Sequence, residues 1–465
     1  MTTSTAAPPT KHPVDRVPPL ARLAPLGLQH VLAMYAGAVA VPLIVGGAMV
    51  QAGKLSAGDL PYLISADLFV AGIATVIQSI GFWRFGVRLP LMQGCTFAAV
   101  TPMIAIGNQY GVTAIYGSVI ASGVFMMLLA PVFAKLLRFF PPLVTGTVIL
   151  IIGLSLMPVA AGWAGGGAGS EDFGAPINLA FAAATLIIIL LIERFAPGPF
   201  ARLSILLGLV LGTLIAIPFG LTDFSGVSEE AWFGVSTPFH FGFPTFPVSA
   251  IVSMCIVALV IMTETTGDML AIGEIVDRHV EPRQLADGLR ADGLSTVLGG
   301  VFNTFPYTAF AQNVGLVSLT GVKSRYVATF AGGVLIVLGL LPKLGAVVEG
   351  IPVAVLGGAG IALFGMVAAS GVRTLGKVHL TNSNILVVAV AVGVGLLPTV
   401  NGDIYHAFPV WFQIIFDSGI SAGALTAIVL NLLLNSEKAN ARVKGDGDVA
   451  PYDAVRSAAA DASGH

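Results

Sequence analysis

Apolar runs of roughly the length of a membrane-spanning helix recur along nearly the whole chain, and short polar segments separate them. A helix needs about 20 predominantly apolar residues to cross a bilayer. Three of the predicted segments, the third, ninth and tenth, are short or interrupted by polar residues. The pattern predicts about fourteen segments, near residues 26–49, 62–83, 89–106, 114–134, 142–160, 176–193, 201–219, 247–271, 291–304, 308–320, 326–342, 351–370, 381–399 and 411–435.

The composition agrees with an integral membrane protein. The chain is 56% hydrophobic and only 10% charged, and a soluble chain of 465 residues could not bury that much apolar surface. Alternating amphipathic segments of about ten residues are absent from the sequence, which disfavours an outer-membrane barrel. The net charge of −2 gives no sign of a nucleic-acid partner. Both cysteines, Cys95 and Cys255, lie in apolar runs, and we expect buried thiols rather than a disulfide or a metal site.

The basic residues predict the orientation. If the N-terminus is cytoplasmic, every Lys and Arg except Lys54 and Lys343 falls in a cytoplasmic segment, as expected of a multi-pass cell-membrane protein with both termini inside. Residues 1–22 are polar and Pro-rich, and the following run lacks a small-residue cleavage site, so we interpret it as the first span rather than a signal peptide. Residues 436–465 have a composition typical of a disordered tail.

The third and tenth segments share an unusual pattern. They read "LPLMQGCTFAAVTPMIAIG" and "FPYTAFAQNVGLVSLTG", and each combines Gly, Pro and a Gln-containing polar patch within a short apolar stretch. Each is third in a set of seven, and an odd number of spans per half gives an inverted repeat. Interrupted segments at corresponding positions indicate a transporter's substrate site, because backbone leaves the helix at membrane depth only where it lines a cavity.

Glu264 and Asp268 are the most informative ionisable residues within the predicted spans. They lie four residues apart in "IMTETTGDML" and therefore share one helix face. Two carboxylates in a low dielectric cannot both be charged at low cost, which suits a group that binds and releases a proton. The alternative is a pair of carboxylates that hydrogen-bond to hydroxyl groups of neighbouring helices.

Other polar residues in the predicted spans leave two interpretations open. His30 is either a core histidine bonded to a neighbouring helix or a functional group. Asp292, at the predicted start of the ninth span, is either the N-cap of that helix or part of a proton relay or ion pair. Asp67 and Asp417 have no comparable neighbours in the sequence, and we interpret them as structural or gate residues.

The sequence lacks the motifs of an intramembrane enzyme or an ATP-driven pump. It contains no H-E-x-x-H, G-x-S-x-G or phosphate-binding loop, and no Lys or Arg lies deep in a predicted span. An enzyme or a receptor would give turnover or signalling without accumulation of substrate, but no nucleophile and base are visible for it. We therefore predict a transporter that is not an enzyme and uses neither a cofactor nor a metal.

The segment "QNVGLVSLTG" resembles the signature motif of the nucleobase–ascorbate transporter family, also called nucleobase:cation symporter family 2. "GLQHVLAMYAGAV", "TETTGD", "ADGL" and "VLGGAGIALFGMVAASGVR" resemble further family segments, so the resemblance covers about residues 20–435. The positions that match the signature are Gln312, Asn313, Gly315, Thr320 and Gly321.

The resemblance implies an all-α polytopic fold with two inverted repeats of seven segments. Short antiparallel strands would lie in segments 3 and 10, and a gate domain would mediate a homodimer. The implied division is a cytoplasmic tail (1–22), core segments 1–4 (23–134), gate segments 5–7 (135–246), core segments 8–11 (247–342), gate segments 12–14 (343–435) and a C-terminal tail (436–465).

Residue choice within the motif is similar to the xanthine and uric acid permease branch. Uracil-type members generally carry an acid where this chain has Gln312, and a His where it has Asp268. A carboxamide offers a donor and an acceptor side by side, which matches the imide edge of an oxidised purine. The resemblance implies that Glu264 and Gln312 bind the base, helped by Phe97, through stacking or its backbone, and by the backbone near Ala311.

The first hypothesis is therefore a proton-coupled importer of xanthine and/or uric acid that works by an elevator-like movement. Asp268, His30 and Asp292 would carry or stabilise the coupling charge, and Asn313 would hold the tenth segment in shape. The alternatives are a permease for uracil or another nucleobase and, ranked lower, an anion transporter of the same fold. Anions rank lower because no basic residue lies between Gln312 and Thr320. The partners expected are a purine, a proton and membrane lipid.

Overall fold

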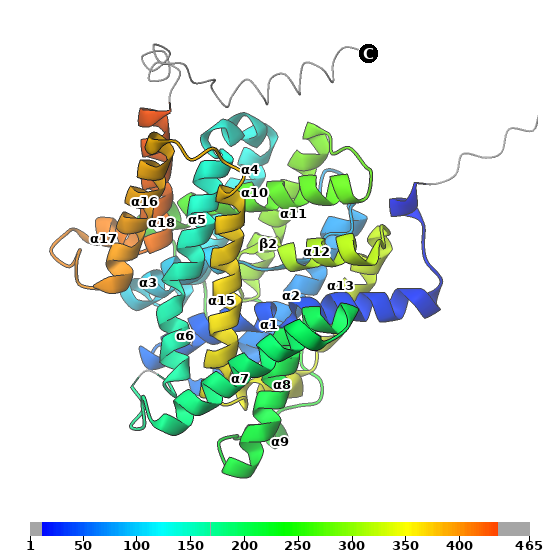
Figure 1. The fold of residues 1–465 in the computed structure, drawn as a ribbon, viewed down its shortest axis with the longest axis vertical. Coiled ribbons are helices and arrows are strands. Elements are labelled where there is room, and N and C mark those ends of the chain that lie inside the picture. Colours follow the sequence, from blue (N-terminus) through cyan, green and yellow to red (C-terminus); the bar gives the residue numbers. More distant parts are fainter. Residues whose placement is uncertain (1–11, 168, 436–465) are drawn as a thin grey trace, which may run out of the picture.

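The computed structural model describes residues 12–167 and 169–435. The C-terminal tail predicted to be disordered, and the first eleven residues of the N-terminal tail, lie outside this part of the chain. The described chain is mostly helical, and Figure 1 shows the helices gathered around a short buried strand, β2.

The helices follow the predicted segments closely. In the first half they are α1 (Leu20–Gln51), α2 (Leu60–Ile80), α3 (Val100–Tyr110), α4 (Val112–Leu136), α5 (Pro142–Ser155), α6 (Met157–Ala164), α7 (Pro176–Phe195) and α8 (Ser204–Ala216). A short helix, α9 (Ser225–Glu229), lies in the connection to the second half. There the helices are α10 (Val248–Ile275), α11 (Pro282–Val301), α12 (Ala311–Thr320), α13 (Arg325–Gly339), α14 (Pro342–Glu349), α15 (Val353–Leu375), α16 (Asn382–Val400), α17 (Val410–Phe416) and α18 (Gly419–Leu434).

Length and hydropathy confirm a multi-pass membrane protein. Within the described residues, 9 helical stretches are long and apolar enough to cross a membrane. The number is 11 if the bent pairs α13–α14 and α17–α18, each with an angle of 80°, count as one span apiece. The predicted segments that do not meet this criterion are the third, ninth and tenth, which are the ones with short or interrupted apolar runs. Each of them still contains a helix, namely α3, α11 and α12.

The predicted start of the ninth segment is wrong, and so is the N-cap interpretation of Asp292. The helix begins at Pro282, where Glu281 and Gln284 form a capping box, and Asp292 lies in its middle, fully buried. The first turns of α11 are polar, so an apolar run could not reveal them. A helix start is instead marked by its capping residues and by proline in the first turn.

Two short strands join the interrupted segments. β1 (Gln93–Cys95) and β2 (Tyr307–Ala309) pair antiparallel, with Gln93 opposite Ala309 and Cys95 opposite Tyr307. Each strand is followed by a helical turn: β1 by the 3-10 helix η3 (Phe97–Ala99), which leads into α3, and β2 by α12. In both segments the backbone thus leaves the helix, and its N–H and C=O groups form hydrogen bonds with the other segment.

The helices form two groups of extensive contacts. In the first group the largest contacts join α4 to α11 and α2 to α13, and in the second they join α5 to α15 and α16 to α18. Glycine makes the close approach of α4 and α11 possible: a methyl group on Gly123 would lie 2.6 Å from the carbonyl oxygen of Gly293. Small residues of this kind are typical of helix contacts in membranes.

A segment that precedes α1 folds back onto the first group. We call residues 12–16, which include the 3-10 helix η1 (Pro13–Asp15), the N-terminal strap. Val14 is fully buried, and the Asp15 carboxylate bridges Arg278, just after α10, at 3.1 Å and Arg325, at the start of α13, at 2.9 Å. The strap therefore ties together helices that are far apart in the sequence.

Candidate functional site

The acids predicted to be functional come together between α10 and α11. Glu264 and Asp268 lie on α10, and the charges of both Glu264 and Asp292 act on Asp268. Gly267 faces open space: no atom lies within 4 Å of the position that a methyl group there would take. One carboxylate oxygen of Asp268 and one of Asp292 have no hydrogen-bond partner among the described residues. Glu264 and Asp268 are therefore partly accessible, whereas Asp292 is fully buried behind them, and both aspartates keep a carboxylate oxygen that can accept a further hydrogen bond.

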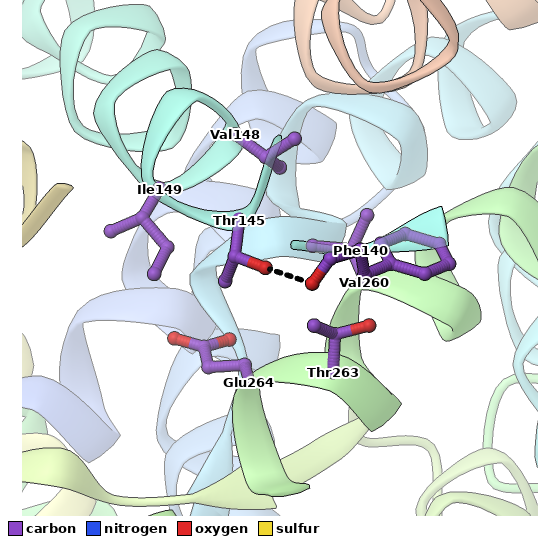
Figure 2. A pocket seen from close by; sticks show the side chains of 7 residues that line it. All are labelled: Phe140, Thr145, Val148, Ile149, Val260, Thr263 and Glu264. Atoms are coloured by element: carbon purple, nitrogen blue, oxygen red, sulfur yellow. Dashed lines mark hydrogen bonds between the residues drawn. The ribbon is translucent and has the colours of Figure 1, made fainter. Parts of the chain in front are cut away.

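A small pocket adjoins Glu264. It has an empty volume of about 210 Å³, which includes its opening. Figure 2 shows Glu264 and Thr263 of α10 across from Thr145, Val148 and Ile149 of α5. The Thr145 hydroxyl donates to the Phe140 carbonyl at 3.2 Å. Except for Glu264 and the threonines, the lining is apolar, as is common in sites for small, flat ligands.

Asp292 is held by a glutamine that the sequence analysis did not select. The Gln78 amide nitrogen donates to the Asp292 carboxylate at 2.8 Å and to the Gly288 carbonyl at 3.1 Å. The Gln78 oxygen accepts from the backbone N–H of Val87 at 2.9 Å, so its amide is fully oriented. Asp292 also faces Gln93 of β1. The contact with β1 places Asp292 beside the strand pair.

His30 lies beside the signature motif rather than beside the acids. The Asn313 side-chain nitrogen donates to the His30 carbonyl at 3.0 Å and lies 3.0 Å from the His30 ring nitrogen Nδ1. Both side chains are buried. Within the described residues, no hydrogen bond of the His30 side chain joins it to Glu264, Asp268 or Asp292.

The candidate substrate-binding residues lie where the two strands end. Ala311 and Gln312 open α12 and are exposed. Phe97 opens η3, is partly buried, and packs edge-on against Phe364 of α15, with ring centroids 5.8 Å apart. α10, which carries Glu264, contacts η3, β2 and α12. Helix N-termini carry partial positive charge and free N–H groups, so this arrangement can receive polar or anionic groups.

The remaining motif residues have structural surroundings. Gly315 lies against Arg202 of the 3-10 helix η5 (Gly198–Leu203). A methyl group added at Gly315 would lie 3.0 Å from a guanidinium nitrogen of Arg202. The Thr320 hydroxyl donates to the Leu316 carbonyl at 2.9 Å near the end of α12. Asn313 bonds α1, as described above. These residues shape α12 and its contacts.

Several threonines that the sequence analysis did not select anchor the strand pair. The Thr75 hydroxyl accepts from the Gln93 backbone N–H at 3.0 Å, and the Thr296 hydroxyl accepts from that of Tyr307 at 3.2 Å. The Thr265 hydroxyl accepts from the Ala309 N–H at 3.2 Å. Hydroxyl groups in apolar spans were visible in the sequence, but only the paired strands show what they bind.

The comparisons with known proteins identify the family. A family model described as "Permease family" matches residues 21–403. The chain is 47% identical over 426 residues to "Xanthine permease" of Bacillus subtilis (strain 168), which covers 91% of this chain and 96% of that protein. This chain belongs to the nucleobase–ascorbate transporter family.

Two further relatives have comparable identities. The chain is 46% identical to "Uric acid transporter UacT" of Escherichia coli (strain K12), with 91% of this chain and 88% of that protein covered. It is 50% identical to "Nucleobase transporter PlUacP" of Paenibacillus larvae, with 88% and 93% covered.

Two solved structures show the fold alone. The transmembrane domain of the cyanobacterial bicarbonate transporter BicA matches with a TM-score of 0.56 at 16% identity, over 86% of this chain and 97% of that one. SLC26A9 matches with a TM-score of 0.59 at 14% identity, over 90% of this chain and 66% of that one. This family member therefore shares its overall fold with transporters of distant sequence.

Proposed function

We propose that this protein imports an oxidised purine, xanthine and/or uric acid, across the cytoplasmic membrane together with a proton. The observation that carries the proposal is that α10, the helix that carries Glu264, contacts η3, β2 and α12, and so meets the two helix starts that follow β1 and β2. It is supported by relatives, 46–47% identical over most of the chain, whose names are xanthine permease and uric acid transporter. A transporter, not an enzyme, is the class to which these relatives belong.

Recognition of the base would use groups of matched polarity. The Gln312 carboxamide would pair with an N–H and C=O edge of the purine, and Glu264 would accept from a second ring N–H. The backbone N–H groups near Phe97 and Ala311 would donate to carbonyl oxygens of the base, favoured by the positive ends of η3 and α12. The Phe97 ring would pack against the face of the purine.

Coupling would depend on the acids. The charges of Glu264 and Asp292 both act on Asp268, and carboxylates that interact in this way can share a proton. The oxygens of Asp268 and Asp292 that have no hydrogen-bond partner in the described chain can receive it. Urate is largely anionic near neutral pH, and moving one negative charge into a negative interior costs about 2.3 kcal/mol per 100 mV. A co-transported proton cancels that cost. His30 would act through Asn313, by stabilising α12 in its working position.

The elevator movement would occur between two domains. The core would comprise segments 1–4 and 8–11 (23–134 and 247–342), and the gate segments 5–7 and 12–14 (135–246 and 343–435), related by an inverted repeat. The largest contacts lie within these groups, whereas most contacts between them, such as α1 with α8, are small; the main exception joins α2 to α14, which begins at the boundary. A space of about 300 Å³ between them is lined mainly by aliphatic side chains and glycine, so few hydrogen bonds would break on sliding. We also propose a homodimer formed by the gates, with both termini cytoplasmic.

Purified protein in liposomes tests the proposal. Radiolabelled xanthine should accumulate when an inward proton gradient is imposed, and unlabelled urate or xanthine should compete more strongly than uracil, guanine or hypoxanthine. Uptake of uracil without purine competition would assign another nucleobase. Accumulation that persists without the proton gradient but requires sodium would overturn proton coupling.

A further inference from the structure

A buried acid behind the site makes hydrogen bonds that the proposed function does not use. Asp67 of α2 is fully buried. Its carboxylate accepts from the hydroxyl of Tyr307 at 2.7 Å and from the hydroxyl of Thr304 at 2.8 Å. The thiol of Cys95 lies 3.4 Å from the carboxylate and 3.3 Å from the Ala38 carbonyl, and it can donate to either. A buried carboxylate with this many donors is a costly feature to build, and it indicates a specific role.

The donors identify what Asp67 holds. Cys95 belongs to β1 and Tyr307 to β2, and the two residues are direct partners across the strand pair. Thr304 lies in the turn that leads from α11 to β2, and its hydroxyl is 3.2 Å from that of Tyr307. In the described chain, Asp67 is the residue whose side chain hydrogen-bonds to both strands; Thr75, Thr265 and Thr296 each bond one strand.

The strand pair needs such an anchor. Each strand is three residues long, and an isolated antiparallel pair of this size is marginal by itself. The chain enters the proposed binding site directly beyond the strands, at Phe97 after β1 and at Ala311 and Gln312 after β2. A small shift of the strand pair would therefore move the starts of both η3 and α12 in the proposed site.

We infer that Asp67 is a positioning residue for purine binding, which fixes the two strands and so aligns the starts of η3 and α12 toward the substrate. The inference rests on the proposed function. A carboxylate suits this task because it only accepts, and each of its three neighbours has a hydrogen to donate. An amide in its place would point N–H groups at one of these donors and lose at least one hydrogen bond.

Uptake kinetics of Asp67→Asn test the inference. We expect the KM for xanthine or urate to rise about tenfold, while the maximal rate per transporter in the membrane stays within about threefold. A merely structural role would instead reduce the amount of protein or the maximal rate and leave the KM unchanged. Ser65→Ala is the matched control, because Ser65 is also buried in α2 but its hydroxyl has no hydrogen-bond partner within the described residues.

A second variant separates positioning from folding. Tyr307→Phe removes the strongest donor and keeps the ring, and it should raise the KM in the same direction. The effect of the double variant with Asp67→Asn should be smaller than the sum of the two single effects, because both changes act on one hydrogen-bond network. The inhibition constants of all purine competitors should rise together, because the starts of both η3 and α12 move.

The same kinetic outcome decides the inference in both variants. KM values within twofold of wild type in Asp67→Asn and in Tyr307→Phe would overturn it. Failure of the wild type to take up any purine would instead overturn the proposed function.

Discussion

Gly72 of α2 and Gly332 of α13 approach each other so closely that neither position has room for a side chain. A methyl group on Gly72 would lie 2.5 Å from the Gly332 carbonyl oxygen, and one on Gly332 would lie 2.9 Å from that of Gly72. Gly123 and Gly293 make the same reciprocal contact between α4 and α11, where the distances would be 2.6 and 2.7 Å. These two contacts connect the predicted second segment with the eleventh and the fourth with the ninth. The proposed inverted repeat predicts this exchange of equivalent partners between the two halves.

The α2–α13 contact predicts different effects for two adjacent glycines. Gly332→Ala should destabilise the protein by about 1–3 kcal/mol, because the added methyl group forces α2 and α13 apart. Gly333→Ala should be neutral or slightly stabilising, since no atom lies within 4 Å of the added methyl group and alanine favours helix. The apparent melting temperature of each variant in detergent measures the difference, and equal values would contradict the close contact.

Replacement of Glu264 should abolish or severely impair uptake. Glu264→Gln keeps the size of the side chain but removes an ionisable acceptor beside Asp268 and the pocket. The protein should still reach the membrane in normal amount. Glu274→Gln is the control, because Glu274 lies on the same helix but is exposed near its end. Normal uptake kinetics in Glu264→Gln would exclude Glu264 from the binding site.

Gln312→Glu should change specificity more than stability. The side chain is exposed at the start of α12, so the fold loses nothing. The carboxylate lacks the N–H donor that would bind a purine carbonyl, and an unpaired acceptor costs about 1–3 kcal/mol, roughly 5- to 150-fold in affinity. Competition by xanthine, urate and uracil against labelled substrate gives the profile. An unchanged profile would show that Gln312 does not face the substrate.

The N-terminal strap should stabilise the protein in a salt-dependent way. Asp15→Asn removes the charge that bridges Arg278 and Arg325, and we expect a loss of about 1 kcal/mol because the group is partly exposed. The difference from wild type should shrink between about 0.05 M and about 0.5 M sodium chloride. Asp403→Asn, at an exposed position, provides the control. A difference that does not change with salt would show that Asp15 acts by packing alone.

The sequence predicted the helices better than the contacts that hold the site. Apolar runs reveal long lipid-facing helices, and Gly, Pro and Gln reveal where β1 and β2 interrupt them. The polar start of α11 carries no apolar run, so its boundary was wrong, and with it the N-cap role of Asp292.

Side-chain partners could not be read from the chain because they lie far apart along it. Asn313 is 283 residues from His30, and Thr304 is 237 residues from Asp67. The residues near Asp67 in the sequence do not indicate a role for its carboxylate. Its hydrogen-bond partners become visible only when α2 packs against the strand pair.

The pairing of β1 with β2 has a consequence for how the protein is made. During synthesis, Gln93–Cys95 enters the membrane long before Tyr307–Ala309 exists, and its backbone N–H and C=O groups then have no strand to bind. Such groups are costly in lipid, so the nascent first half must keep this segment near water or against other helices until the second half arrives. The first half alone could not complete the proposed binding site. If the halves are the proposed repeats, an ancestor with a single copy would have needed a second chain to supply the missing strand.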